Sequence, residues 1–124
     1  MLASKKMLGF VMTNDSARSR EFYEQKLGFK FVSKDEFALV MKTDENMIRI
    51  SEGKNVVPAA HTILGWQVEK IESVVSWLTQ RGVTFERYGW AKQDALGVWA
   101  APSGDQVAWF KDPDGNVLSI SEHR

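Results

Sequence analysis

The side chains that most often act as nucleophiles, bases or metal ligands are scarce in this sequence of 124 residues. It holds two histidines, His61 and His123, and no cysteine, which excludes disulfides, thiolate catalysis and cysteine-bound metals. A Ser-His-Asp arrangement would need one of these histidines beside an activated serine, and no nucleophile-elbow motif is present. We expect His61 at the surface where a strand begins and His123 at a frayed terminus. The residues therefore predict no catalytic constellation of these kinds.

Aromatic side chains are abundant instead, with five tryptophans and seven phenylalanines. Tryptophan side chains usually lie where a core or a ligand needs a large flat surface. Trp90, Trp99 and Trp109 are the candidates for stacking on a ligand. Trp90 lies in the irregular stretch 87–97, which would be either a lid or a loop packed by its own aromatic ring. Trp99 and Trp109 lie on neighbouring predicted strands, where they would contact a ligand, the sheet core or a dimer interface.

The charge of the chain is balanced, since 16 Lys and Arg residues oppose 16 Asp and Glu residues. Proteins that bind nucleic acid usually carry a basic excess or stripe, so we expect no nucleic-acid partner. No stretch approaches the roughly 18 apolar residues of a membrane span, and no secretory leader is recognisable. We therefore expect no membrane partner and a cytoplasmic location. The length predicts a single domain.

Hydrophobic patterning predicts the elements that must position these side chains. In the first half, a helix over 16–27 begins after Asn14-Asp15 and ends at Gly28. The strands around it are expected at 7–13, 29–32, 37–41 and 47–51. The second half shows the same β-α-β-β-β order, with a helix whose apolar face starts at Ile71 and which ends before Gly82. Its strands are expected at 61–68, 83–85, 98–101, 106–111 and 116–121.

The two halves also match in spacing and in short strings. The separation from Leu8 to Phe22 equals that from Ile63 to Trp77, and the string at 46–51 resembles the string at 116–121. Internal repeats of this kind indicate two copies of one unit. We divide the single domain 1–124 into module one (1–52), a connector (53–60) and module two (61–124).

Three stretches carry a resemblance to a known family: EFYEQKLGF at 21–29, the segment from Val68 to Arg81-Gly82-Val83, and AWFKDPDGNVL at 108–118. They resemble the vicinal oxygen chelate superfamily, which includes glyoxalase I, bleomycin-resistance proteins and extradiol dioxygenases. The resemblance implies an α+β fold of two βαβββ modules, each curling its sheet around a cavity, usually within a homodimer.

The same resemblance implies where a divalent metal would be held, on the first and last strands of each module. Those four positions are occupied by Leu8, Arg49, Ile63 and Ser119. None is a usual ligand, and the arginine would repel a cation. His61 lies on the same strand face as Ile63, but one histidine alone does not hold a metal. We therefore predict no metal and no cofactor.

Strand alternation predicts which residues line the cavity. Leu64, Trp66 and Val68 are expected to face the helix layer, and Trp77 to pack on its helix. The expected lining is apolar and aromatic with a few polar points, which is typical of a small-molecule site. Besides the three tryptophans, it comprises Leu8, Phe10, Arg49, Ile63, Gln67 and Ser119. An inward-facing Arg49 would either pair with a carboxylate or await an anionic ligand.

These features favour a metal-independent protein that binds or sequesters a planar, neutral or anionic small molecule. The alternative is a metal-dependent lyase or dioxygenase of the glyoxalase kind with a non-standard site. A third possibility is an interaction module whose tryptophans serve an interface.

Overall fold

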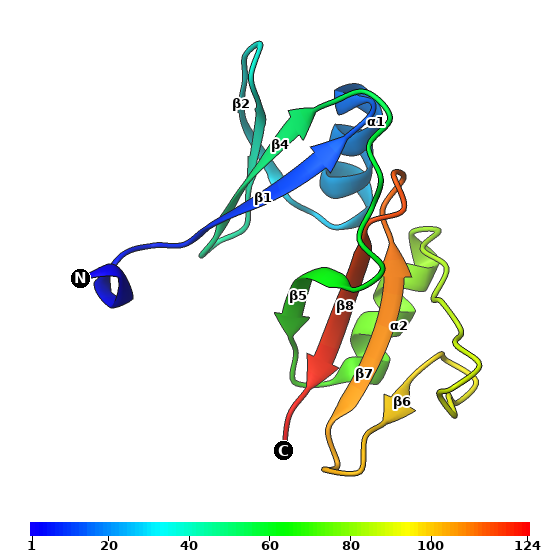
Figure 1. The fold of residues 1–124 in the computed structure, drawn as a ribbon. Helices are drawn as coiled ribbons and strands as arrows, with labels where there is room; N and C mark the ends of the chain where they lie inside the picture. Colours follow the sequence, from blue (N-terminus) through cyan, green and yellow to red (C-terminus); the bar gives the residue numbers. More distant parts are fainter. The chain divides into compact units, whose positions relative to one another are not determined.

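The computed structural model describes all 124 residues. The chain forms two compact units, Met1–Val57 and Pro58–Arg124, each described here by itself. Each unit contains one four-stranded mixed sheet and a helical segment in β-α-β-β-β order (Figure 1). The α+β fold of two βαβββ modules is therefore confirmed, and the units are called module one and module two below.

Module one pairs its first strand with its last, which places the two ends of the βαβββ unit side by side. The sheet order is β1-β4-β3-β2, with β1 parallel to β4 and the other pairs antiparallel. A short 3-10 helix, η1 (Leu2–Ser4), precedes the sheet, and the α-helix continues as a π-helical turn, η2. The elements are β1 (Leu8–Thr13), α1 (Ser16–Glu21), η2 (Phe22–Lys26), β2 (Lys30–Lys34), β3 (Leu39–Lys42) and β4 (Met47–Glu52).

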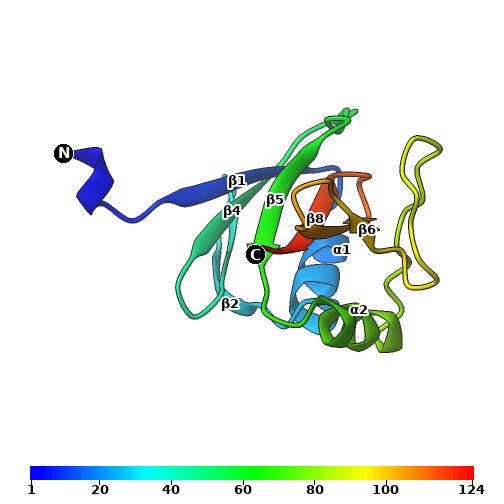
Figure 2. The same ribbon diagram turned by 90° about the horizontal axis from the view of Figure 1, so that it is seen from below.

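Module two repeats this topology with the order β5-β8-β7-β6, and β5 runs parallel to β8. The long connection between α2 and β6 runs out past the edge of the sheet (Figure 2). The elements are β5 (Thr62–Gln67), α2 (Ile71–Gln80), β6 (Trp99–Ala100), β7 (Gln106–Lys111) and β8 (Val117–Glu122).

Each helix begins against a glutamate from the last strand of its own module. In module one, Glu52 Oε1 accepts a hydrogen bond of 3.2 Å from the backbone N–H of Ser16. Asp15 adds a second cap, because its Oδ1 accepts from the backbone N–H of Arg18 at 3.1 Å. The first turn of a helix has unpaired N–H groups, so carboxylates at this end stabilise it.

In module two, Glu122 Oε1 accepts from the backbone N–H of Ile71 at 2.9 Å. The residue at the N-cap, Lys70, makes no capping hydrogen bond with its side chain. Glu122 is therefore the side-chain cap of α2. Glu122 follows Ser121 in the sequence, just as Glu52 follows Ser51. The internal repeat therefore includes the glutamate that joins the last strand to the start of the helix.

The core of module two lies between α2 and one face of its sheet. Ile71, Val75 and Leu78 are buried on the helix, in the i, i+4, i+7 spacing that the sequence predicted. Each such side chain contributes about 1.5–3 kcal/mol by leaving water. Trp66 stacks on Phe110 with ring centroids 6.2 Å apart, which confirms that it faces the helix layer. The sheet supplies Ala108, Phe110, Leu118 and Ile120.

Two predicted elements differ from the structure. The expected strand at 83–85 is a single bridge between Phe85 and Phe110, because Glu86 donates its N–H to Trp109 and the chain then leaves the sheet. The helix expected over 16–27 is α-helical only to Glu21.

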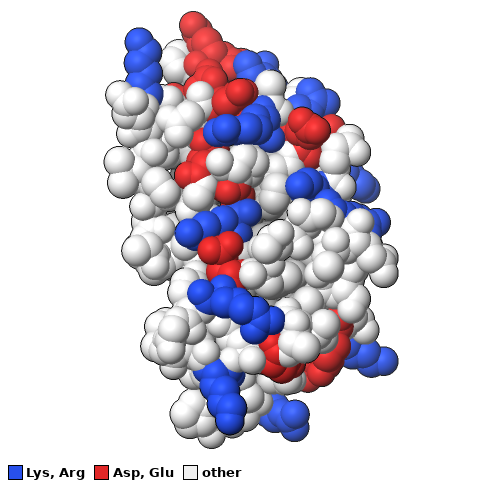
Figure 3. Space-filling view, turned by 90° about the vertical axis from the view of Figure 1, so that its right-hand side faces the viewer, with Lys and Arg blue, Asp and Glu red and all other residues white.

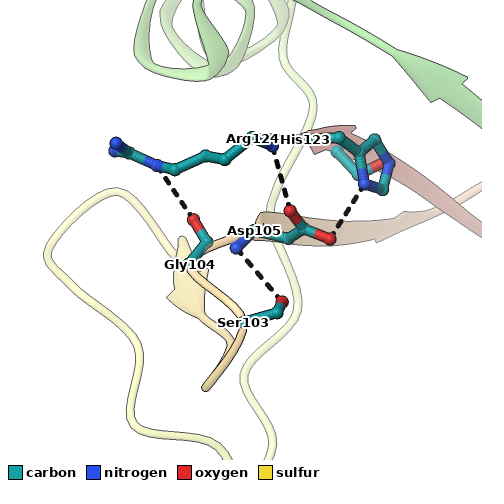
Figure 4. A network of polar contacts seen from close by, with 6 residues as sticks. Ser103, Gly104, Asp105, His123 and Arg124 are labelled. Carbon is teal, nitrogen blue, oxygen red and sulfur yellow. Dashed lines mark hydrogen bonds and ion pairs between the residues drawn. The ribbon is translucent and has the colours of Figure 1, made fainter.

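A third expectation, a frayed terminus at His123, is also wrong. The ring lies between Asp105 and Ser121 and is hydrogen-bonded to both, and Figure 4 shows the contact with Asp105. The segment after β8 is therefore tied to the turn that precedes β7.

The longest helix, α2, has ten residues. None of the helices has the length and apolar character needed to cross a membrane.

Candidate functional site

The register of module two separates its sheet into a helix-facing side and an opposite side. Paired residues on adjacent strands share a face. Trp109 pairs with Ser119, and Ser119 pairs with Gly65, so these three lie on the side away from α2. A second row on this side runs from Trp99 through Val107 and Ser121 to Gln67.

Four aromatic rings meet at one end of this side, and we call them the aromatic cluster: Tyr88, Trp90, Trp99 and Trp109. Trp90 is edge-on to Trp99 and to Trp109, with centroids 5.2 and 5.6 Å apart. Trp99 and Trp109 approach to 5.9 Å, so the predicted pairing across β6 and β7 is confirmed. Tyr88 stacks on Trp90 at 6.0 Å and meets Trp109 edge-on at 5.3 Å.

The loop that carries Tyr88 and Trp90 is held from inside by Gln93. Its Oε1 accepts from the N–H of Tyr88 at 2.9 Å, and its Nε2 donates to the carbonyls of Glu86 and Gly97 at 2.9 and 2.7 Å. One amide side chain thus joins the start and the end of the loop. The loop is ordered by its own contacts, so the aromatic cluster is preformed.

The aromatic cluster keeps a large part of its surface in contact with water. Trp90 is 66% exposed, and the other three rings are half-buried. Aromatic pairs contribute about 0.5–1.5 kcal/mol beyond the area they bury, and they hold one another's edges and faces in fixed directions. A flat ligand would find ring surfaces already oriented for stacking.

The polar residues predicted for the cavity lie beside the cluster on the same side of the sheet. Ser119 is half-buried next to Trp109, and Gln67 is exposed. A β-bulge lies between Thr62 and Leu64, with Ile63 at its centre, half-buried. A Cβ added at Gly65 would lie 3.4 Å from Ser119 Oγ, so the missing side chain keeps this hydroxyl open.

The corresponding side of module one is apolar and exposed. Leu8, Phe10 and Met12 alternate along β1, and Phe10 is 68% exposed. Arg49 pairs with Phe10 in the register and is half-buried. It makes no ion pair within the chain.

Asp35, in the turn between β2 and β3, interacts electrostatically with Arg49. The backbone N–H groups of Ala38 and Phe37 lower the pKa of the Asp35 carboxyl, with a smaller contribution from Arg49. Asp35 is therefore an ionised neighbour and not a contact partner. Arg49 keeps its hydrogen-bond donors for another acceptor.

A hollow in module one has a volume of about 330 Å³ and lies where β1 begins, between lysines and the 42–46 turn. Arg49 does not line it. A more open hollow of about 440 Å³ lies on the outer side of α2, between Glu72 and Gln80. Neither contains a residue of the aromatic cluster. The aromatic cluster is the better candidate site for a flat ligand, because its rings hold one another in fixed directions.

The residues present do not fit a divalent metal. Of the four positions expected for ligands, Leu8 and Ile63 offer hydrocarbon, Arg49 a cation and Ser119 a neutral hydroxyl. A divalent metal prefers imidazole, carboxylate or thiolate donors. No group of three or more such side chains is arranged to hold a metal ion anywhere in the chain.

Sequence reasoning missed Tyr88 and the chain of contacts through His123. Tyr88 lies in a loop without periodicity. The only signal in the sequence is that Tyr88 lies two residues from Trp90, a spacing that can place both rings on the same side of the chain. Ser121 and His123 also alternate by two, and this spacing places both side chains on one side of an extended segment. The partner, Asp105, is distant in sequence and is found only through the register of β7 and β8.

Charges on the face drawn in Figure 3 are mixed in sign. The face in Figure 3 shows Lys and Arg side chains interspersed with Asp and Glu. No broad basic or acidic field covers this face, consistent with the net charge of zero.

One family model matches most of the chain, and solved structures share its fold. The model of the Glyoxalase/Bleomycin resistance protein/Dioxygenase superfamily matches residues 7–120. Among solved structures, a glyoxalase family protein from Bacillus anthracis superposes with a TM-score of 0.74 at 20% identity, over 98% of this chain and 96% of the other. No curated protein matches the sequence.

Two further structures carry functional names. TnmS3, an antibiotic binding protein from Streptomyces sp. CB03234, gives a TM-score of 0.71 at 21% identity and covers 100% of this chain and 99% of its own. Lactoylglutathione lyase from Agrobacterium tumefaciens gives 0.69 at 18% identity, covering 96% and 93%. At these identities the likeness concerns the fold.

Proposed function

Because the chain belongs to the Glyoxalase/Bleomycin resistance protein/Dioxygenase superfamily, we propose that it binds or sequesters a planar, neutral or anionic small molecule without a metal. The observation that carries the proposal is the aromatic cluster of module two. Its four rings are preformed, partly exposed and placed beside Ser119. Small-molecule sites combine apolar surfaces with a few placed polar groups, as this side of the sheet does.

The proposal of a neutral or anionic ligand rests on the charges near the candidate residues. Ser119 and Gln67 provide neutral hydrogen-bonding groups, and Lys111 is engaged with Glu86 at 3.6 Å. In module one, Arg49 would attract an anion at its own sheet face. Among structures of this fold, an antibiotic binding protein supports a role in binding.

Metal independence is supported by the four expected ligand positions, which hold no suitable donor. The alternative, a metal-dependent lyase or dioxygenase, is the activity type of one structural neighbour. Elemental analysis of the purified protein separates the two. A divalent ion in stoichiometric amount that is needed for binding would overturn the proposal.

Ligand class is tested by titrating tryptophan fluorescence with three probes of one ring system: naphthoate, naphthamide and naphthylmethylammonium. We expect saturable quenching by the first two and little by the cation. Trp109→Ala should weaken the quenching. Trp77→Phe is the matched control, because Trp77 lies on α2 and stacks with Arg81 instead of joining the cluster. Silence with all three probes, or equal loss in both variants, would overturn the proposal.

A homodimer and a cytoplasmic location remain proposals. The dimer is supported by Leu8, Phe10 and Met12, which expose a continuous apolar stripe on β1, a feature typical of interfaces. Sedimentation of the wild type should give twice the chain mass, and Phe10→Glu should lower the sedimenting mass to that of the monomer.

The cytoplasmic location is supported by the cysteine-free sequence, which suits a reducing compartment.

A further inference from the structure

Three side chains of module two form a relay at the end of β8. Ser121 Oγ lies 2.8 Å from His123 Nε2, and His123 Nδ1 lies 3.0 Å from Asp105 Oδ2. Figure 4 shows the second of these contacts. We propose that Ser121 is an activated nucleophile and that module two hydrolyses aryl esters of small carboxylic acids. This activity goes beyond ligand binding and does not depend on it.

The direction of the relay follows from the chemistry of its partners. An ionised carboxylate only accepts hydrogen bonds, so the contact with Asp105 requires the proton of His123 to be on Nδ1. In the neutral ring, the lone pair of Nε2 then faces Ser121 Oγ, which donates to it. The backbone N–H of Arg124 and the contact with His123 lower the pKa of the Asp105 carboxyl, so it stays ionised near neutral pH.

The three side chains are positioned by strand geometry and by the segment after β8. Ser121 and His123 are two residues apart in extended chain, and side chains at this spacing point to the same side. Asp105 immediately precedes β7, whose first residue Gln106 pairs with Glu122. Arg124 completes the arrangement, since its N–H donates to Asp105 Oδ1 at 3.1 Å and its Nε to the carbonyl of Gly104 at 3.1 Å.

A substrate can reach this relay from the side of the sheet opposite α2. His123 and Asp105 have side chains that are 47% and 31% exposed, and Ser121 is half-buried. Gln67 pairs with Ser121 in the register and is exposed, and its side-chain amide makes no hydrogen bond within the chain. Its amide can therefore donate to the carbonyl oxygen of an ester as negative charge develops there.

The class of substrate follows from the neighbours of Ser121 in the same row. Val107 lies on the next strand and Trp99 on the one after it. Two strand spacings are about 10 Å, so an aryl group would lie over Val107 with its edge toward Trp99. The acyl group of a small acid would then lie between Ser121 and Gln67.

The reaction balances without a cofactor. Ser121 Oγ bonds to the ester carbonyl carbon, and its proton passes to His123 Nε2. The bond to the aryl oxygen breaks, and this oxygen takes the proton from His123 Nε2, so that the aryl alcohol leaves and the imidazole is neutral again. Water then attacks the acyl-serine, gives its proton to His123 Nε2, and the proton returns to Ser121 Oγ as the acid leaves.

The test uses the whole chain and the probe nitrophenyl acetate. We expect a burst of nitrophenolate equal to the protein present, and peptide mass spectrometry should find one acetyl group on Ser121. Ser121→Ala should remove the burst and the adduct. His123→Ala should slow turnover by about 10²–10⁴-fold, the contribution usual for general acid–base catalysis.

Asp105 would be a positioning residue, so its test needs a readout that a structural role would not move. Asp105→Asn should lower kcat by about tenfold or more while KM stays unchanged, because the imidazole loses its orientation and tautomer. Asp105→Glu, which keeps the carboxylate, should recover part of kcat.

Two matched controls should keep the wild-type burst. Ser51→Ala removes the repeat counterpart in module one, and His61→Ala removes the other histidine. The counterpart of His123 in module one is Gly53, so Ser51 has no base.

Three results would overturn the proposal: a burst that survives in Ser121→Ala, an acetyl group mapped to a histidine or lysine, or turnover no faster than that of free imidazole. Adduct mapping on the wild type decides the matter even if a variant fails to fold. Nitrophenyl acetate lacks the fused rings of the naphthyl probes, so failure here leaves the fluorescence titration unaffected.

Discussion

The two modules share a frame, meaning the strand order and the helix cap that hold each module together. They differ in the side chains on the sheet face away from the helix, called the free side below. In both, the first and last strands are parallel neighbours, and the glutamate that ends the last strand caps the helix. On the free side, module one presents an apolar stripe and Arg49, while module two presents the aromatic cluster and a serine-histidine pair. The repeat therefore conserves the contacts that hold a module together and leaves its surface open to change.

The largest effects should come from the shared frame and should be similar in the two modules. Phe110 and Met41 are buried at corresponding places on the third strands of their sheets. We expect Phe110→Ala to lower the free energy of unfolding by about 3–5 kcal/mol and Met41→Ala by about 2–5 kcal/mol. Denaturant unfolding of each variant measures this, with the exposed Phe37→Ala as the control. A loss below about 1 kcal/mol in one module only would mean that the frames are not equivalent.

The next effect should separate the free sides of the sheets. Trp90→Ala removes the most exposed ring of the aromatic cluster, so we expect naphthoate to bind roughly tenfold more weakly, as the loss of about 1.4 kcal/mol implies. Phe10→Ala in module one should leave this affinity within about twofold. Fluorescence or calorimetric titration measures both. Equal loss of affinity in the two variants would contradict the assignment of the ligand to module two.

A smaller effect should distinguish the two helix caps. Glu122→Ala removes the side-chain cap of α2, and we expect it to cost about 1 kcal/mol of unfolding free energy. Glu52→Ala should cost less, because Asp15 still caps α1. Thermal unfolding of the two variants gives the comparison. A larger loss in Glu52→Ala would show that the second cap does not compensate.

The smallest effect concerns acid stability. Asp35 and Asp105 both precede the third strand of their module, and hydrogen bonds lower the pKa of each carboxyl. A carboxyl whose pKa is lowered by folding stabilises the protein above its unfolded pKa and loses this contribution as pH falls through the folded value. Asp105→Asn and Asp35→Asn should each flatten the acid limb of stability against pH. The effect should be small because both carboxylates are near the surface. A steeper acid limb in either variant would contradict this sign.

Much of the frame could be predicted because it depends on local signals. The apolar spacing from Ile71 to Leu78 and the glycines at the helix ends specify the helices, and Asp112 with Gly115 specifies the last turn. Asp112 Oδ1 accepts from the N–H groups of Asp114 and Asn116, and Gly115 has a φ of 87°. These contacts span few residues, so their signals lie close together in the sequence.

The candidate site was only partly predictable, because its residues meet through pairing between strands. Trp99 and Trp109 were found since each lies on a strand with clear alternation. The segment Val83–Phe85 has a strand-like composition, but composition does not specify whether a neighbouring strand is available to pair with it along its length. His123 was misjudged because a position near a terminus says nothing about a carboxylate brought beside it by the register.

The parallel pairing of first and last strands has a consequence for synthesis. A βαβββ unit of this kind closes only when its final strand arrives, since that strand supplies both the neighbour of the first strand and the helix cap. Module one has all its own contacts once the chain to Val57 has left the ribosome, because Gly53 and Val56 still bond to Thr13 and Asn14, whereas the helix cap of module two waits for Glu122. Folding during translation would therefore proceed in two steps, and truncation within β8 would leave the second step incomplete.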